Sequence, residues 1–241
     1  KEYVVVPPVQ VPNDTKDKGQ IVRVIASEAN TTLTFTPDQP VGKVLVNAGD
    51  FVEIPTTIAK FVVSADKKIL VSQYMVGQDG GYGTSDPDML LAVPTAQFRK
   101  NYLFYAQPAW SANYVDIIAP AGAAVTVDGA PVGNFTPIAA SGFSLAHVKL
   151  SNAGDGSHSV TGDQGVGISV YGVIDYGSYR YPGGLHLGVG LDVYEPLEPV
   201  YDVHEALAPG APVIHQRDGL PLVRVRPAPA DEDEEDRKSV V

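Results

Sequence analysis

Polar and apolar residues alternate along several short stretches of the chain. The alternation is clearest in Thr32-Leu33-Thr34-Phe35-Thr36 and in Ala124-Val125-Thr126-Val127, which leads directly into the hairpin turn signal Asp128-Gly129. A period of two places successive side chains on opposite faces of a strand. Other runs rich in β-branched and aromatic residues are Ile21 to Ile25, Val44 to Val46, Phe61 to Val63, Ile69 to Val76, Tyr102 to Tyr105, Val115 to Ile118 and Ile168 to Ile174. No window carries a helical stripe of more than about three turns, so the sequence predicts an all-β protein.

Three stretches of the chain recur in the same order at a nearly constant offset of roughly 95 residues. The pairs are Lys1-Glu2-Tyr3-Val4-Val5-Val6 with Lys100-Asn101-Tyr102-Leu103-Phe104-Tyr105, Ile21-Val22-Arg23-Val24-Ile25-Ala26 with Tyr114-Val115-Asp116-Ile117-Ile118-Ala119, and Leu70-Val71-Ser72-Gln73-Tyr74-Met75-Val76 with Gly167-Ile168-Ser169-Val170-Tyr171-Gly172-Val173. Such a period is too long for a solenoid repeat and suits a β-sandwich module. The sequence therefore predicts two tandem β-sandwich-like modules, residues 1–94 and 95–184, packed on each other across an apolar linker at residues 90–94.

The pattern changes from Leu185 onward. Prolines are spaced through residues 195–199, 208–212 and 226–229, and an acidic run follows at residues 231–236. Proline at this spacing prevents continuous strand pairing and long helices. We therefore expect residues 185–241 to form an extended Pro-rich and acidic arm, and a neighbouring subunit is the simplest surface for it to lie against.

Composition and charge narrow the class of partner. The formal net charge is −11 with 17 Lys plus Arg against 28 Asp plus Glu, which repels phosphate backbones and argues against nucleic acid. The chain has no cysteine, which excludes disulfides, thiolate metal sites and cysteine nucleophiles. No stretch approaches the roughly 18 apolar residues of a membrane span, and the first residues have no signal-peptide layout, as expected of a mature or trimmed product.

The sequence resembles bacterial members of the IgGFc-binding protein N-terminal domain family over roughly residues 1–188. The motifs that carry the resemblance are Glu2-Tyr3-Val4-Val5-Val6-Pro7, Arg23-Val24-Ile25-Ala26, Asn30-Thr31-Thr32-Leu33-Thr34, Asn47-Ala48-Gly49-Asp50, Lys68-Ile69-Leu70-Val71-Ser72-Gln73-Tyr74-Met75, Asp86-Pro87-Asp88-Met89, Tyr171-Gly172 and Ser178-Tyr179-Arg180-Tyr181-Pro182-Gly183-Gly184. The resemblance implies an extracellular β-rich module used in adhesion or within a larger surface protein, with no catalytic residues to carry over. The chain departs from the animal mucus proteins of the family in having no cysteine, so immunoglobulin binding is not predicted.

Reactive constellations are sparse. The five histidines (His147, His158, His186, His204 and His215) show no paired ligand spacing and are expected to lie at the surface or to be satisfied by hydrogen bonds. Ser169 lies in a Gly-rich run without the G-x-S-x-G elbow of a serine hydrolase, and its counterpart in the first module is the core-strand residue Ser72. Trp110, with Tyr102, Tyr105 and Tyr114 nearby, is expected to fill a core. No catalytic residue, cofactor or metal is predicted.

The loop at residues 77–88 is the longest Gly/Asp segment. Its oxygen-rich composition could hold calcium, but its spacing fits no EF-hand, which favours a plain inter-strand loop. The second interpretation is a contact loop formed by Asp79, Tyr82, Asp86 and Asp88. Asp86 and Asp88 also raise the hypothesis of a carbohydrate-active enzyme, because two carboxylates flanking a sugar bond can perform acid/base work.

These observations lead to one principal functional hypothesis and a runner-up. The principal hypothesis is a non-enzymatic, secreted or cell-surface protein acting in adhesion or binding, with a protein or glycan as its partner. The alternative is a structural subunit of a polymeric surface fibre or layer that self-associates by docking residues 185–241 on the next subunit.

Overall fold

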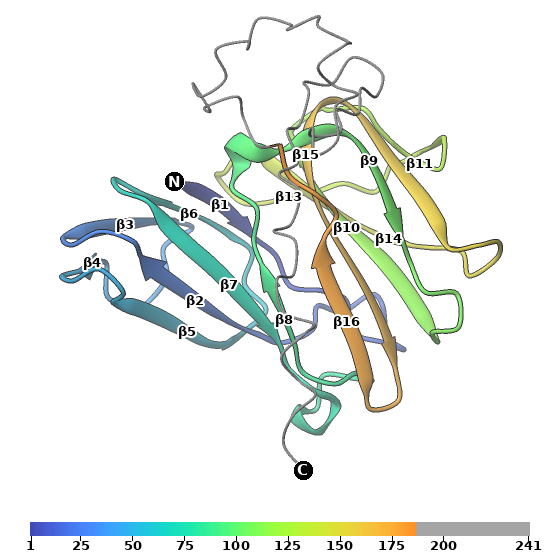
Figure 1. Cartoon of the computed structure of the whole chain (residues 1–241), viewed down its shortest axis with the longest axis horizontal. Helices are drawn as coiled ribbons and strands as arrows, with labels where there is room; N and C mark the ends of the chain where they lie inside the picture. The colour runs from blue at the N-terminus through green and yellow to red at the C-terminus, as the bar shows by residue number, and fades with distance from the viewer. Residues whose placement is uncertain (187–241) are drawn as a thin grey trace, which may run out of the picture. The chain divides into compact units, whose positions relative to one another are not determined.

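Sixteen β-strands and two short 3-10 helices make up residues 1–186, the part of the chain that this computed structural model describes. Figure 1 shows strands β1 to β7 gathered on one side and β9 to β15 on the other, with β8 and β16 between them. The elements of residues 1–94, called the first half below, are β1 (Glu2–Val5), β2 (Gln20–Ala26), β3 (Thr31–Thr36), β4 (Val44–Leu45), β5 (Phe51–Thr57), β6 (Phe61–Ala65), β7 (Ile69–Met75), η1 (Gln78–Gly80) and β8 (Asp88–Leu91). Those of residues 95–186, the second half, are η2 (Thr95–Gln97), β9 (Arg99–Tyr105), β10 (Ala112–Pro120), β11 (Val125–Val127), β12 (Ala130–Pro131), β13 (Thr136–Pro137), β14 (Phe143–Lys149), β15 (Ser157–Ile174) and β16 (Gly177–Pro182). The all-β prediction is confirmed.

The first half packs two four-stranded antiparallel sheets face to face. Their strand orders are β1-β6-β3-β4 and β5-β2-β7-β8. The inner faces form one core, in which Tyr3, Leu33 and Phe61 of the first sheet meet Val22 and Val71 of the second. Alternation along β2 explains this, since Val22, Val24 and Ala26 are buried while the residues between them are partly exposed.

The second half contains one eight-stranded antiparallel sheet, where the sequence analysis expected a second pair of sheets. The difference comes from β15, which runs without interruption through residues 157–174 and pairs with β9 and β11 at its start and with β10 and β16 at its end. Its pairing with β9 changes register between Thr161 and Val166, where a Cβ at Gly162 would lie 2.8 Å from the Gln164 carbonyl oxygen. In the first half a turn at residues 66–68 separates the corresponding strands β6 and β7.

The strand pairings of the two halves nevertheless correspond. The order β1-β6-β3-β4 recurs as β9-β15-β11-β12, and β5-β2-β7-β8 recurs as β14-β10-β15-β16. The registers also agree, because Tyr3 pairs with Val63 as Tyr102 pairs with Val160. In the other sheet, Ile25 pairs with Phe51 as Ile118 pairs with Leu145. The division into modules at residue 94 stays a prediction, and these pairings are what a duplication would produce.

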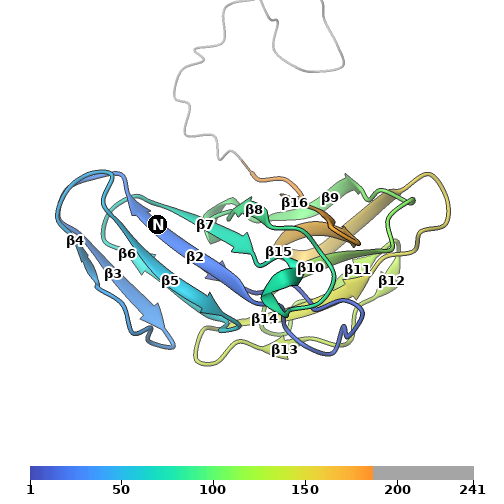
Figure 2. The same cartoon turned by 90° about the horizontal axis from the view of Figure 1, so that it is seen from below.

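The N-terminal segment joins the two halves. Val4, Val6 and Val62 pack on Leu145 and Ile138 of the second half, and further along the segment Val9 packs on Tyr114 and Tyr171. The backbone N–H of Val9 donates to the Tyr171 hydroxyl at 3.0 Å, and the Tyr114 hydroxyl donates to Asp14 at 3.0 Å. Figure 2 shows residues 6–19 passing from β1 towards the strands of the second half. As a result β10 is buried on both faces, whereas its counterpart β2 is buried on one.

The expected C-terminal arm lies almost wholly outside the described residues, so its conformation and its docking on a neighbour stay predictions. Within residues 1–186, no helix has the length and apolar character needed to cross a membrane.

Candidate functional site

One face of the sheet β5-β2-β7-β8 points away from the core and carries large apolar side chains. Phe51 is 53% exposed, Met89 49%, Leu91 45% and Leu70 42%, which is unusual for four such residues on one face. The strand registers place them beside one another. We call this surface the open face, and its residues are Ile21, Arg23, Ile25, Phe51, Glu53, Leu70, Ser72, Tyr74, Met89 and Leu91.

Arg23 lies in the middle of the open face. Its guanidinium carbon is 4.5 Å from the centroid of the Phe51 ring and 5.6 Å from that of Tyr74, and Nη2 lies 2.7 Å from a Glu53 carboxylate oxygen. The hydrogen bond to Glu53 raises the pKa of Arg23, so this side chain is cationic at every physiological pH. Stacking on two aromatic rings holds the charge flat against the sheet and leaves the apolar side chains around it accessible.

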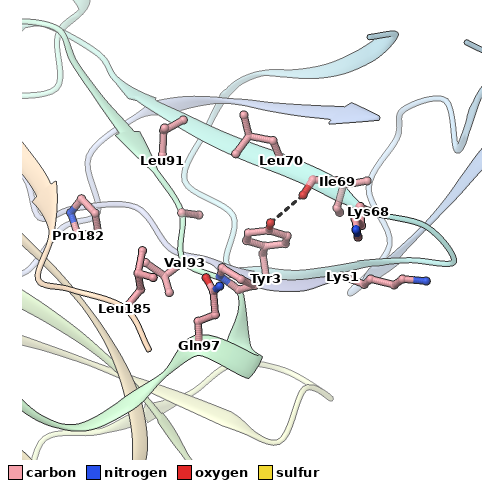
Figure 3. A pocket seen from close by; sticks show the side chains of 12 residues that line it. Lys1, Tyr3, Lys68, Ile69, Leu70, Leu91, Val93, Gln97, Pro182 and Leu185 are labelled. Atoms are coloured by element: carbon pink, nitrogen blue, oxygen red, sulfur yellow. Dashed lines mark hydrogen bonds between the residues drawn. The ribbon is translucent and has the colours of Figure 1, made fainter. Parts of the chain in front are cut away.

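A groove of about 460 Å³ continues the open face at the edge of the first half. Figure 3 shows Leu70 and Leu91 on one wall, Tyr3 and Gln97 on the other, and Lys1 and Lys68 at one end. The Tyr3 hydroxyl donates to the Ile69 carbonyl at 2.7 Å, which fixes the position of this largely buried side chain in the groove lining. Because Leu70 and Leu91 belong to both surfaces, the groove and the open face form one continuous apolar area bordered by two lysines.

A buried polar cluster lies where the two halves meet. Asp116 accepts a hydrogen bond from His147 Nδ1 at 2.6 Å and another from the Tyr171 hydroxyl at 2.9 Å, and His147 Nε2 lies 3.5 Å from Asp17. Burial alone would lower the pKa of His147, but Asp116 and Asp17 outweigh it and raise the pKa to about 9. Burial, together with the Asp116 charge, raises the pKa of Tyr171 well above its usual value.

This cluster has the residue types of an acid/base site but not the access of one. Asp116 and Tyr171 are both fully buried, and Arg180 is 6% exposed. Asp116 itself is therefore out of reach of a substrate, although the His147 side chain is 21% exposed. Because Asp17 belongs to the first half and His147 to the second, we interpret the cluster as a structural link between the halves. The prediction that the histidines lie at the surface or are satisfied by hydrogen bonds applies only in part within residues 1–186, since Nδ1 of His147 is bonded while the buried Nε2 atoms of His147 and His158 have no hydrogen-bond partner. His158 is held in the same way by Asp128 at 2.7 Å.

The sequence model of the IgGFc-binding protein family matches residues 1–172. This chain belongs to the IgGFc-binding family. The resemblance found in the sequence is thereby confirmed, although the family match ends before the Ser178–Gly184 motif. No curated protein and no solved structure matched the chain. The IgGFc-binding match includes the whole open face and the Asp116–His147 pair.

The predicted contact loop of this IgGFc-binding family member lies between the two halves. Tyr82 packs against Gly19, while the Tyr176 hydroxyl donates to Asp79 at 3.3 Å. The Asp86 carbonyl accepts a hydrogen bond from Ser178 at 2.9 Å, and burial raises the pKa of the half-buried Asp88. The contacts of Asp79 with Tyr176 and of Asp86 with Ser178 therefore join the loop to the second half. Whether Asp79, Tyr82, Asp86 and Asp88 also touch an outside partner stays a prediction.

Within residues 1–186, no three His, Asp or Glu side chains are grouped closely enough to hold a metal ion. Trp110 packs edge-on against Tyr179 with ring centroids 5.2 Å apart, and is only partly buried. Of the three tyrosines expected near it, none is its ring partner in the structure.

Sequence reasoning missed the open face. The alternation Ile21, Arg23, Ile25 was visible, but apolar residues on both faces of a strand usually indicate burial on both faces. The signal that could have separated the halves is the loop after the first strand of each, which spans residues 6–19 in the first half and only residues 106–111 in the second. Only the longer loop can cover a neighbouring sheet.

Proposed function

We propose that this protein is a non-enzymatic binding protein of the cell exterior that acts in adhesion and holds a protein partner on its open face. The single observation that carries the proposal is the exposure of Phe51, Leu70, Met89 and Leu91 on one sheet face. Apolar and aromatic side chains around one stacked arginine are the composition of protein interface cores. Membership of the IgGFc-binding family supports binding as the general activity.

A protein partner fits the open face better than a glycan. Sugar rings stack on flat aromatic faces and need many hydrogen bonds at their rims. Here Arg23 already occupies one face of the Phe51 ring, and the neighbouring side chains Leu70, Met89 and Leu91 are aliphatic or thioether groups that offer no hydrogen bonds. Burying such groups against another protein is favourable by about 25 cal/mol for each Å² removed from water.

The test measures retention of the fluorescently labelled full chain on washed, intact cells of the species that produces it. We expect Phe51→Glu combined with Leu70→Glu to abolish retention, because both carboxylates would be desolvated in the contact. Thr34→Glu, on an exposed position of β3, adds a charge on a different sheet and is expected to be retained as the wild type is. Equal retention of the double variant and the wild type would refute the proposal.

A carbohydrate-active enzyme is the competing class of function. It requires turnover of a glycan that depends on Asp86, so the measurement is a hydrolysis screen of wild type and Asp86→Asn on a broad glycan panel. We expect neither protein to release reducing sugar. Release by the wild type that Asp86→Asn abolishes would replace the binding proposal.

A further inference from the structure

The internal interface between the halves provides a template for the open face. In the second half, the cross-strand pair Ile118–Leu145 is covered by Val4, Val6 and Val62 of the first half. The cross-strand pair at the same register in the first half is Ile25–Phe51, part of the open face. Within residues 1–186 no equivalent strand covers it, and Phe51 is 53% exposed. The first half therefore carries an acceptor surface of the kind that is filled in the second half.

The covering strand also has an uncovered counterpart. The register matches Tyr3–Val63 and Tyr102–Val160 align β1 with β9, so that Val4 corresponds to Leu103 and Val6 to Tyr105. Val4 and Val6 are 3% and 2% exposed, because they lie in the internal interface. Leu103 is 80% exposed and Tyr105 is 50% exposed. The second half therefore presents an inserting strand, β9, whose two outward apolar side chains are exposed instead of buried between the halves.

We propose that copies of this chain associate head to tail, with Leu103 and Tyr105 of one copy packing on Ile25 and Phe51 of the next. The inference rests on the proposed function, since it names the partner of the open face as a second copy of this chain. The two surfaces are different patches of the molecule, so the contact is heterologous, and each added copy leaves one patch of each kind unoccupied. Association then continues into a chain of molecules unless the geometry closes a ring.

The intermolecular contact reproduces only part of the internal one. Inside the chain, the long segment after β1 adds Val9 and Val11 to the interface, whereas the segment after β9 spans only residues 106–111. The position of Val62 corresponds to Ser159, which pairs with Leu103 as Val62 pairs with Val4. The contact between copies is therefore smaller and less apolar than the internal interface, and we expect it to dissociate on dilution.

The experiment uses two end-blocking variants of the full chain. Phe51→Glu removes the acceptor surface and keeps the inserting strand, while Leu103→Glu does the reverse. Light scattering over a concentration series should give a wild-type mean mass that rises above that of one chain. Each variant alone should stay at the mass of one chain, and their equimolar mixture should reach twice that mass and no more. Thr34→Glu is the matched control and should behave as the wild type.

Three results would overturn the proposal. These are a wild type that stays at the mass of one chain at every concentration, a variant mixture that forms no dimer, and a Leu103→Glu variant that dimerises by itself, which would indicate a symmetric contact through the open face. Both positions are exposed, and circular dichroism checks that the variants fold. If a glutamate variant fails to fold, the experiment uses Phe51→Ser and Leu103→Ser in its place.

Self-association and the proposed function fail in different measurements. If all proteins stay at the mass of one chain while Phe51→Glu with Leu70→Glu abolishes retention on cells, the open face binds another protein and the head-to-tail inference is wrong. If the mixture dimerises while the double variant is retained on cells as the wild type is, the head-to-tail inference is supported and the proposed binding to cells through the open face is wrong.

Discussion

The buried charge of Asp116 allows a sharp stability prediction. Asp116 accepts bonds from His147 at 2.6 Å and from Tyr171 at 2.9 Å, and Arg180 is the buried cation nearby whose charge Asp116 stabilises. Asp116→Asn keeps the size of the side chain and removes its charge. Hydrogen bonds to a charged group contribute about 1.5–3 kcal/mol each, and removing one partner of a buried ion pair costs about 3–5 kcal/mol. We therefore expect Asp116→Asn to lower the free energy of unfolding by about 3–5 kcal/mol.

The two halves supply a matched control for this substitution. Arg23 occupies the register position of Asp116, pairing with Ser72 as Asp116 pairs with Ser169. Its ion pair with Glu53 lies on the open face in contact with solvent, where water screens the attraction. We expect Arg23→Gln to change stability much less than Asp116→Asn does.

The assay is urea unfolding followed by the fluorescence of Trp110, the only tryptophan of the chain. With an unchanged slope, the shift of the midpoint gives the change in the free energy of unfolding. A midpoint for Asp116→Asn no lower than that for Arg23→Gln would refute the view that the buried cluster holds the halves together.

Three further predictions concern pH, backbone conformation and the two ends of the proposed assembly. The pKa of His147 is raised in the folded state to about 9, so the stability that protonated His147 contributes is complete below a pH of about 6.5 and is lost as the pH rises through about 9. The difference in urea unfolding midpoint between wild type and His147→Gln should therefore shrink over that pH range. Gly83 has φ of +78°, and an added Cβ would lie 2.3 Å from a backbone carbonyl oxygen, so Gly83→Ala should lower the free energy of unfolding by more than about 1 kcal/mol. Gly129 has φ of +79° but open space around it, so Gly129→Ala should lower it by less. Thermal unfolding of the two variants compares the losses. Val4→Ala should lower the free energy of unfolding by about 2 kcal/mol, because Val4 is buried between the halves. Leu103→Ala, at the corresponding exposed position, should change the free energy of unfolding of the single chain by less than about 0.5 kcal/mol. Equal losses in urea unfolding would contradict the register match.

Local patterns in the sequence predicted the strands because those strands are half-buried. Residues 32–36 alternate and lie in β3, which is buried at every second position. Asp128-Gly129 connects β11 to β12 with Val127 opposite Ala130, as the turn signal indicated. In each case the information lies within a few neighbouring residues, where a period of two and turn chemistry act directly.

The buried cluster could not be predicted in the same way. Asp116 lies in an apolar run, and its partners His147 and Tyr171 come 31 and 55 residues later. No local pattern states that a neighbouring strand supplies the hydrogen bonds of a buried carboxylate. Only residues 168–174 of β15 were predicted as a strand, because the glycines earlier in β15 weaken the local strand pattern and its neighbours β9, β10, β11 and β16 are distant in the sequence.

The packing of the N-terminal segment on the second half has a consequence for biosynthesis. The hydrogen bond from the Val9 amide to the Tyr171 hydroxyl cannot form until Tyr171, 162 residues later in the chain, has been synthesised. Until β10, β14 and β15 have been translated, the valines at positions 6, 9 and 11 lack the partners that bury them and stay exposed on the nascent polypeptide. Pairings of such long sequence separation form slowly, so a chaperone that shields this valine-rich segment would raise the yield of native protein.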